Sequence, residues 1–368
     1  MSPAPGPTPA RADDGAGERG YAPLPALSRA LEAVACGEDL GRHRAGEVVE
    51  LLMQGRVGDV QAAAFLMGLR AKGETIEEVV GFANTMRRLG VGVDLGDVED
   101  AIDIVGTGGD RLFTFNISTT AAFVVAATGV PVAKHGNRAV TSHTGAADVL
   151  EALGVRIDLD CEQVAACVRR TGIGFMFAPR HHQALRHLSG VRRDLGVPTI
   201  LNLLGPLTNP ARVRRQVVGV GSPRHGRLMA EVLHALGSER ALVVHGAEGL
   251  DELSVAGPSA MIAVDERGVG AVQAVAPEDV GLRRWPLADL RGGDPAHNAG
   301  ITRRVLAGET GAPLDAVLLN AGAGVMVGGR AADLARGVAL ARVAVESGAA
   351  ERLLADLVRE SRALAGNT

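Results

Sequence analysis

The spacing of hydrophobic residues predicts an all-helical segment at the start of the chain. Across residues 24 to about 90, apolar positions such as Leu27 and Leu31 recur at the three- and four-residue spacing of amphipathic helices. Thr75 and Glu78 form a capping-box sequence ahead of an apolar run, which marks the start of another helix. This part of the chain is therefore expected to be a small helical unit.

After this segment the pattern changes to short apolar runs, typical of buried strands, separated by helical segments. Such alternation implies a largely parallel sheet covered by helices. Residues 180–210 interrupt it with a helical pattern and three prolines, which suggests a return to the helical unit. The predicted strands are 101–105, 130–134, 173–177, 217–220, 241–244 and 261–264, and the predicted helices include 118–128, 144–153, one capped by Asp160 and Gln163, and 331–364.

We therefore predict an α/β protein with a small all-helical domain and a larger α/β domain, whose mostly parallel central sheet is flanked by helices. The small domain would comprise residues 23–95 and about 186–210, and the α/β catalytic domain residues 96–185 and 211–368. Residues 1–22 are rich in Pro, Ala, Gly and charge and lack the apolar stretch of a signal peptide, so we expect a disordered tail.

Composition narrows the class of partner. The chain is 46% hydrophobic and 22% charged, which is ordinary for a soluble protein, and a formal charge of −4 with 2% aromatic residues argues against nucleic-acid binding. The apolar run at 121–133 is too short and too broken to cross a membrane. Cys36, Cys161 and Cys167 form no CxxC pair. We expect a cytoplasmic protein with a small-molecule partner, no nucleic acid and no membrane.

A glycine-rich segment, GTGGD at 106–110, follows the first predicted strand. Three glycines in four positions allow backbone N–H groups to converge on one anion. Asn116, Ser118 and Thr119 then begin an apolar helix, whose N-terminus favours phosphate. The segment lacks the GK[ST] ending of a Walker loop and the third glycine of the dinucleotide fingerprint. A phosphate loop is therefore predicted, with a simple tight turn as the alternative, and an ATPase or dehydrogenase is disfavoured.

Charged residues of opposite sign follow two other predicted strands. KHGNR at 134–138 places Lys134 at the carboxyl end of a strand, where a diphosphate could bind. A later strand runs into HGAEGLDE, in which Asp251 and Glu252 lie in a loop and could share a hydrated Mg²⁺. A solvated charged turn and a surface acidic pair are the alternatives. The sequence shows neither the spacing of a zinc site nor a GxSxG elbow.

Taken together, the motifs resemble those of the anthranilate phosphoribosyltransferases, which have the nucleoside phosphorylase-like, or class III, phosphoribosyltransferase fold. This resemblance covers about residues 24–365 and implies transfer of the phosphoribosyl group of phosphoribosyl pyrophosphate (PRPP) to the amine of anthranilate, in tryptophan biosynthesis. The motifs occur in family order: GTGGD at 106–110, NIST at 116–119, KHGNR at 134–138, GAADVLEALG at 145–154, FAP at 177–179, VRRDLG at 191–196, NLLGPLTNP at 202–210, HGAEGLDELS at 245–254 and LLNAGA at 318–323.

The resemblance also implies site residues, two Mg²⁺ ions and a homodimer formed through the helical domain. The expected PRPP ligands are Gly106, Thr107, Gly108, Gly109, Asp110, Thr114, Asn116, Ser118, Thr119, Lys134 and Ser142. The expected anthranilate contacts are Gly106, His135, Asn137, Pro179, His182 and Arg192. Ser118, Asp251 and Glu252 are expected to bind metal, and Lys134, Asn137 and Arg192 to be catalytic.

Four positions depart from the usual family pattern. Arg111 stands where many members have glycine, His143 where Ser, Lys or Leu is more usual, Glu248 where Asp is common, and Gln183 where proline often follows the histidine. Two related activities stay open: a pyrimidine-nucleoside phosphorylase, which shares the fold, and a paralogue acting on a substituted anthranilate. A third reading is a non-catalytic relative that binds nucleic acid or a regulatory partner.

Overall fold

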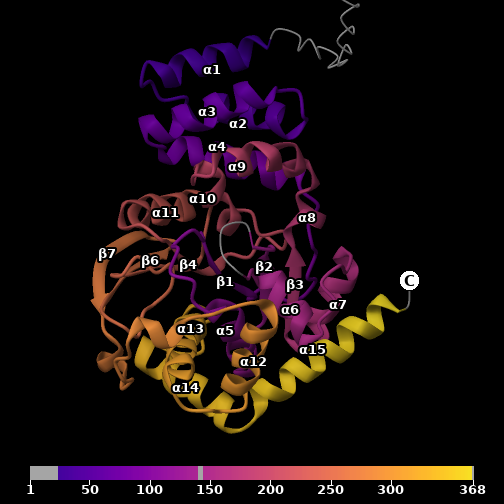
Figure 1. Cartoon of the computed structure of the whole chain (residues 1–368), viewed down its shortest axis with the longest axis vertical. Helices are drawn as coiled ribbons and strands as arrows, with labels where there is room; N and C mark the ends of the chain where they lie inside the picture. Colours follow the sequence, from indigo (N-terminus) through magenta and orange to yellow (C-terminus); the bar gives the residue numbers. More distant parts are fainter. Residues whose placement is uncertain (1–23, 140–143, 367–368) are drawn as a thin grey trace, which may run out of the picture.

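Helices α1 to α4 form the N-terminal unit of the computed structural model, which describes residues 24–139 and 144–366 (Figure 1). The predicted tail at 1–22, Ser142 and His143 lie outside the described residues. The capping box of α4 is present, because Thr75 Oγ1 accepts from Glu78 N at 3.4 Å and Glu78 Oε2 accepts from Thr75 N at 2.9 Å. The helices are α1 (Pro25–Ala35), α2 (Gly41–Met53), α3 (Asp59–Lys72) and α4 (Ile76–Leu89).

A seven-stranded sheet forms the second unit, in the order β3-β2-β1-β4-β5-β6-β7. The four pairings from β3 to β5 are parallel, and the pairings of β6 with β5 and with β7 are antiparallel. The sheet is therefore mostly parallel, as predicted. The strands are β1 (Ile102–Gly106), β2 (Val132–Gly136), β3 (Ile173–Phe177), β4 (Arg215–Gly219), β5 (Arg240–Gly246), β6 (Ser259–Asp265) and β7 (Gly268–Val275).

Helices cover both faces of the sheet, because successive strand residues point to opposite sides. Val217 packs into the cluster formed with α5 and α13, whereas Val218 packs into the cluster shared with α11 and the N-terminal helices. The remaining elements are α5 (Ile117–Ala127), α6 (Ala146–Leu153), α7 (Cys161–Thr171), α8 (Ala178–His181), η1 (Gln183–Leu188), α9 (Ser189–Leu195), α10 (Ile200–Leu207), α11 (Pro223–Ala235), η2 (Pro277–Val280), η3 (Leu287–Leu290), α12 (Pro295–Leu306), α13 (Ala312–Val327), α14 (Leu334–Glu346) and α15 (Ala349–Ala365).

The segment after β3 joins the helical unit. Leu188, Val191 and Leu203, from η1, α9 and α10, lie in the same buried cluster as Leu27 and Phe65 of the N-terminal helices. Figure 1 shows α9 and α10 between α4 and the sheet. The boundary between the helical unit and the sheet is therefore lined by helices on one side and by strand ends on the other.

Three details of the predicted pattern were wrong. The single helix predicted at 331–364 is two helices, α14 and α15, because Gly348 adopts a left-handed φ of 71° between them. Strand β7 was not predicted, since most of its residues are exposed and it lacks alternating apolar positions. Strand β2 extends two residues further than predicted, to Gly136, because it pairs with β3 over its whole length.

Two further features concern the helices and the cysteines among the described residues. None of their helices combines the length and apolar character that crossing a membrane requires. The three cysteines, Cys36, Cys161 and Cys167, are free thiols. Cys167 is buried in the apolar core.

Helices α13 and α14 pack with their backbones in close contact. A Cβ atom on Gly337 of α14 would lie 2.2 Å from the carbonyl oxygen of Gly322 in α13, so glycine is required for this approach. By contrast, a Cβ atom on Gly300 of α12 would meet only the Arg304 side chain, at 3.6 Å.

These two glycines give a matched stability test. Gly337→Ala should lower the free energy of unfolding by about 1–3 kcal/mol, because the two helix backbones must move apart. Gly300→Ala should be neutral or stabilise by up to about 1 kcal/mol, because alanine favours the helix. Urea unfolding of both variants checks this, and a Gly337→Ala protein as stable as the parent would contradict the packing argument.

Candidate active site

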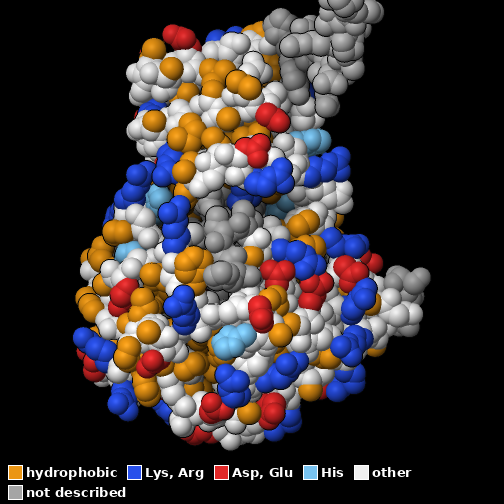
Figure 2. Space-filling model, viewed as in Figure 1, with side chains coloured by type: hydrophobic (Ala, Val, Ile, Leu, Met, Phe, Trp, Pro, Cys, Tyr) orange, Lys and Arg blue, Asp and Glu red, His pale blue; other side chains and the backbone are white. Residues whose placement is uncertain are grey.

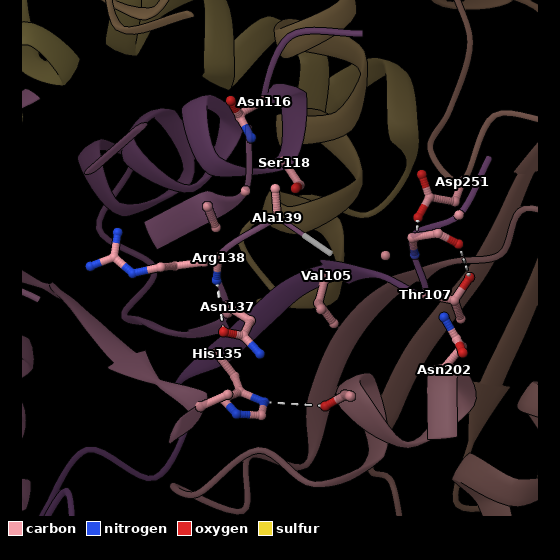
Figure 3. A pocket seen from close by; sticks show the side chains of 18 of the residues that line it. Val105, Thr107, Asn116, Ser118, His135, Asn137, Arg138, Ala139, Asn202 and Asp251 are labelled. Carbon is pink, nitrogen blue, oxygen red and sulfur yellow. Dashed lines mark hydrogen bonds between the residues drawn. The ribbon is translucent and has the colours of Figure 1, made fainter. Parts of the chain in front are cut away.

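A cavity of about 330 Å³ lies between the carboxyl ends of the strands and helices α9 and α10. Lys and Arg side chains gather along this boundary on the face shown in Figure 2, which suits an anionic ligand. The predicted site residues that line the cavity are Gly106, Thr107, Gly108, Gly109, Asp110, Thr114, Asn116, Ser118, Thr119, Lys134, His135, Asn137, His182, Arg192, Asp251 and Glu252. Figure 3 shows several of them converging from different elements.

One described residue of the predicted site lies elsewhere. Pro179 is exposed in the first turn of α8 and is absent from the cavity lining, whereas its neighbour Ala178 lines the cavity. Of the adjacent histidines only His182 reaches the cavity, and His181 instead bonds the Val91 carbonyl at 3.2 Å.

The glycine-rich loop leaves β1 through left-handed backbone. Gly108 and Gly109 have φ values of 69° and 81°, which glycine adopts without steric cost. Arg111 and Phe113 adopt φ values of 59° and 55° in the same loop, although side chains disfavour this region. The departure from glycine at position 111 therefore falls where the backbone favours glycine, so it stiffens the loop at a conformational cost.

Asp251 and Glu252 accept hydrogen bonds from two backbone N–H groups that were predicted to bind phosphate. Asp251 Oδ2 accepts from the Gly108 N–H at 2.6 Å, and Glu252 Oε1 accepts from the Ser118 N–H at 2.9 Å, in the first turn of α5. The loop and the helix end thus converge as predicted, but two of their N–H groups hold carboxylates. A phosphate would therefore meet the remaining donors beside two carboxyl groups.

Crowded negative charge at this place calls for a cation. Burial, and then the neighbouring Asp110 carboxylate, raise the pKa of Asp251 to about 7. Burial and the charge of Asp251 also raise the pKa of Glu252 well above its usual value. Glu252 Oε2 is buried and has no hydrogen-bond partner among the described residues. An unpartnered carboxylate oxygen is a ligand that a metal ion would satisfy.

The donor set fits Mg²⁺ better than a transition metal. Within the described parts of the chain, His, Cys, Asp and Glu side chains nowhere gather in threes with the geometry of a metal cage. Mg²⁺ keeps several waters and is commonly held by one or two carboxylates together with substrate phosphates. Asp251 and Glu252, with the Ser118 hydroxyl lining the same cavity, are compatible with that mode.

Lys134 lies in strand β2, as predicted, and His135 also belongs to this strand, which extends past the predicted end at residue 134. Lys134 is 3% exposed, and its ammonium donates to the Ile104 carbonyl of the neighbouring strand. Burial lowers the pKa of Lys134, whereas the charges of Asp103 and Glu252 oppose that shift. Lys134 therefore lines the cavity while its ammonium is hydrogen-bonded to the backbone of β1.

Asp103 supports this lysine from the centre of the sheet. Its carboxylate accepts from Asn209 Nδ2 at 2.8 Å and from the His135 N–H at 3.3 Å. Burial raises the pKa of Asp103 to about 6, although the charge of Lys134 opposes the shift. Neither Asp103 nor Asn209 was predicted from the sequence to be a site residue.

Nitrogen groups from three segments, namely β2, the end of α8 and α9, also line the cavity. The rings of His135 and His182 meet edge to face, with centroids 5.3 Å apart. His135 Nδ1 lies 3.2 Å from the Gly205 carbonyl and His182 Nε2 lies 2.8 Å from the Thr208 carbonyl. Arg192 of α9 is half-buried and has no carboxylate partner among the described residues. Its guanidinium therefore remains available to an acidic ligand.

Helix α10 supplies lining residues that the sequence analysis missed. The motif NLLGPLTNP at 202–210 was identified, but no side chain in it was assigned to the site. Asn202, Gly205 and Thr208 recur every three residues, which is the spacing of one helix face and was the available signal. The lining residues on or next to α10 are Leu201, Asn202, Leu204, Gly205 and Thr208.

Two family models match the chain. One described as "Glycosyl transferase family, a/b domain" matches residues 98–351, and one described as "Glycosyl transferase family, helical bundle domain" matches residues 28–90. The chain is 50% identical to anthranilate phosphoribosyltransferase of Xanthobacter autotrophicus over 91% of its length and 96% of that protein. It is also 50% identical to the enzyme of that name from Rubrobacter xylanophilus, over 92% and 99% of the two chains.

Solved structures agree with these matches. Anthranilate phosphoribosyltransferase of Thermus thermophilus superposes with a TM-score of 0.85 at 46% identity, over 90% of this chain and 99% of that one. The Saccharomyces cerevisiae enzyme in complex with PRPP and Mg gives 0.84 at 27% identity, and its complex with 4-fluoroanthranilate gives 0.83 at 25%, each over 92% and 98% of the two chains. Both units are shared at this identity and coverage, and the chain accordingly belongs to the anthranilate phosphoribosyltransferase family.

Proposed function

We propose that this chain transfers the phosphoribosyl group of PRPP to the amine of anthranilate, giving N-(5-phosphoribosyl)anthranilate and pyrophosphate. One observation carries the proposal: a single cavity joins the phosphate loop and acidic pair on the sheet to the unpaired Arg192 on α9. The complexes of the yeast relative with PRPP and Mg and with 4-fluoroanthranilate support the same substrate classes.

Breaking the bond between ribose and diphosphate leaves positive charge on the sugar and negative charge on the leaving group. Catalysis therefore requires fixed groups that stabilise the departing anion. The amides of the glycine-rich loop and of the start of α5 that do not hold Asp251 or Glu252 would face that anion, and Lys134 lines the same cavity. Mg²⁺ held by Asp251, Glu252 and Ser118 would neutralise charge on the diphosphate.

The acceptor needs orientation more than activation. The amine of anthranilate is an aniline and is neutral near pH 7, so no strong general base is required before it attacks. Arg192 is placed to bind the substrate carboxylate through its planar guanidinium, and Asn137 to orient the ring. Direct attack of the amine on the ribose carbon gives inversion there and no covalent enzyme intermediate.

The proposal extends to two Mg²⁺ ions, a cytoplasmic location and a homodimer. The unpartnered Glu252 Oε2 and the crowding of Asp110, Asp251 and Glu252 support a high local demand for cations. Free thiols suit a reducing compartment. Val60 of α3 is 83% exposed, and an apolar surface residue on the helical unit is compatible with a dimer contact there.

The deciding experiment mixes purified protein, PRPP, Mg²⁺ and anthranilate and follows loss of the free amine by fluorescence. Product formation supports the proposal, and its absence under varied Mg²⁺ contradicts it. Parallel reactions with thymidine plus phosphate and with ring-substituted anthranilates test the phosphorylase and paralogue alternatives. Titration with DNA tests the binding-protein alternative.

The imidazole rings of His135 and His182 are neutral near pH 7. Burial, followed by the proximity of His182, lowers the pKa of His135 to about 3, and burial lowers the pKa of His182 to about 4. Because backbone carbonyls only accept, His135 Nδ1 and His182 Nε2 carry the ring protons. Of His135, His182 and Arg192, only Arg192 therefore carries a charge.

The depressed pKa of His135 predicts a pH dependence of stability. In the unfolded chain this histidine has a pKa of about 6.5, so below that pH the unfolded state binds a proton that the folded state does not. The stability associated with the neutral ring is thus present above pH 6.5 and is lost as the pH falls towards 3. The contribution of His135 should fall by about 2 kcal/mol between pH 7 and pH 5.

This contribution is isolated by comparison with His135→Gln, whose amide does not titrate. Urea unfolding of both ligand-free proteins at pH 5, 6 and 7 gives the difference in their unfolding free energies. Asp103, whose pKa is raised to about 6, changes stability with pH in the opposite direction. Because both proteins contain Asp103, its effect cancels in the difference. A difference that stays constant over this range would contradict a buried neutral ring.

Substitution of Arg192 should separate the two substrates. Arg192→Ala should raise KM for anthranilate about 10- to 100-fold, the loss of a charge-assisted contact, and change KM for PRPP far less. Arg193→Ala is the matched control, because Arg193 is adjacent, is 80% exposed and does not line the cavity. Steady-state kinetics in each substrate measure both constants, and equal weakening of both would count against the assignment.

Replacement of the acidic pair by amides should alter the demand for metal. Asp251→Asn combined with Glu252→Gln should raise the Mg²⁺ concentration for half-maximal rate and lower turnover by at least about tenfold. Glu248→Gln serves as control, since Glu248 lies in the same loop and does not line the cavity. An unchanged Mg²⁺ titration curve for the double variant would remove both carboxylates as ligands.

A further inference from the structure

A buried asparagine lies directly behind the cavity wall. Asn298, in the first turn of α12, is 1% exposed and does not line the cavity. Its neighbour Asn116 does line the cavity, at the start of α5 beside Ser118 (Figure 3). Helix α12 packs against α5, so residues 182 positions apart meet there (Figure 1).

Asn298 is part of a closed ring of four hydrogen bonds. Gly293 N donates to Asn298 Oδ1 at 2.7 Å, and Asn298 Nδ2 donates to Asn116 Oδ1 at 3.0 Å. Asn116 Nδ2 then donates to the Thr144 carbonyl at 3.0 Å. Thr144 Oγ1 closes the ring by donating to the Gly293 carbonyl at 2.7 Å.

The direction of every bond in this ring follows from its chemistry. A backbone N–H can only donate, so the oxygen of Asn298 must face Gly293 and its NH₂ must face Asn116. The oxygen of Asn116 therefore faces Asn298, and its NH₂ faces the Thr144 carbonyl, which can only accept. Rotation of either amide by 180° would set donor against donor or acceptor against acceptor.

Gly293, which takes part in two of these hydrogen bonds, is itself held in place by its neighbours. Residues 290–292 run antiparallel to the segment after the glycine-rich loop: Phe115 N donates to the Leu290 carbonyl at 3.0 Å and Gly292 N to the Phe113 carbonyl at 2.8 Å. A Cβ atom on Gly292 would lie 2.8 Å from both Phe115 N and the Thr114 carbonyl oxygen. Gly293 thus starts from a backbone that is tied to the loop it helps to position.

We infer that Asn298 is a positioning residue, which acts through Asn116 to fix the direction of its carboxamide towards the ligand. One N–H of Asn116 Nδ2 is used by Thr144, and the second has no hydrogen-bond partner among the described residues, so in this lining residue it is available to a ligand in the cavity. An N–H donor suits the oxygens of a phosphorylated sugar. The inference rests on the proposed function, because it takes Asn116 to contact PRPP.

The test substitutes Asn298 by an isosteric acid. Asn298→Asp keeps an oxygen for the Gly293 N–H but has no N–H for Asn116 Oδ1, so Asn116 loses the bond that orients it. KM for PRPP should rise about tenfold, as for loss of one oriented hydrogen bond, while KM for anthranilate and kcat change less than about threefold. Asn298→Ala, which adds no charge, should shift KM for PRPP in the same direction.

Coupling to Asn116 separates positioning from general stability. If Asn298 acts through Asn116, the double variant Asn116→Ala with Asn298→Ala should have the same KM for PRPP as Asn116→Ala alone. Multiplied effects of the two substitutions would overturn the inference. Thr302→Val is the control, since Thr302 lies one turn further along α12, is fully buried and bonds Thr120 Oγ1 at 2.9 Å. It should leave KM for PRPP unchanged, and a rise equal to that of Asn298→Ala would also overturn the inference.

Calorimetric titration with PRPP and Mg²⁺ distinguishes failure of this inference from failure of the proposed function. Parent protein that binds PRPP but does not consume anthranilate contradicts the proposed reaction and still allows the Asn298 test on PRPP affinity. Parent protein that binds no PRPP overturns both. Parent and Asn298→Ala proteins of equal PRPP affinity, both folded by thermal unfolding, overturn the positioning role alone.

Discussion

The site depends on one close approach, in which the acidic loop rests directly on the ends of two strands. A Cβ atom on Gly219 would lie 1.5 Å from the Asp251 carbonyl oxygen, and one on Gly106 would lie 2.1 Å from Asp251 Oδ2. Glycine at position 219 is required for the loop backbone to lie there, and glycine at position 106 leaves room for the Asp251 side chain. Because β1 pairs with β4 and β4 with β5, this contact joins Asp251 to Gly108, 143 residues earlier in the chain.

Much of the fold could be predicted because local sequence and tertiary structure agree. The capping boxes begun by Thr75 and Asp160 start α4 and α7 where the sequence placed them. Strand β7 could not be predicted, since an edge strand whose residues are mostly exposed has no core to impose alternation. The break at Gly348 was missed because the apolar pattern of α14 continues into α15 across one left-handed residue.

Many residues of the candidate site could be predicted from the sequence, but the hydrogen bonds among them could not. Glycine and charged residues that directly follow a predicted strand are a recognisable sequence pattern, so Lys134 and Glu252 could be found from the sequence. What the sequence could not show is which group each one meets: Lys134 bonds a strand carbonyl, and Glu252 takes a helix N–H. Polar residues behind the wall, such as Asp103 and Asn298, give no local signal, because their roles arise from contacts with distant segments.

The two walls of the cavity are carried by different units, and this has a mechanical consequence. Arg192 belongs to α9, which shares its core with the N-terminal helices, whereas Lys134 lies in the sheet. The chain crosses between these units three times, after α4, after β3 and after α10. A small rigid tilt of the helical unit would therefore bend all three connectors together and change the distance between Arg192 and Lys134. The stiffness of the connectors thus sets how wide the cavity opens.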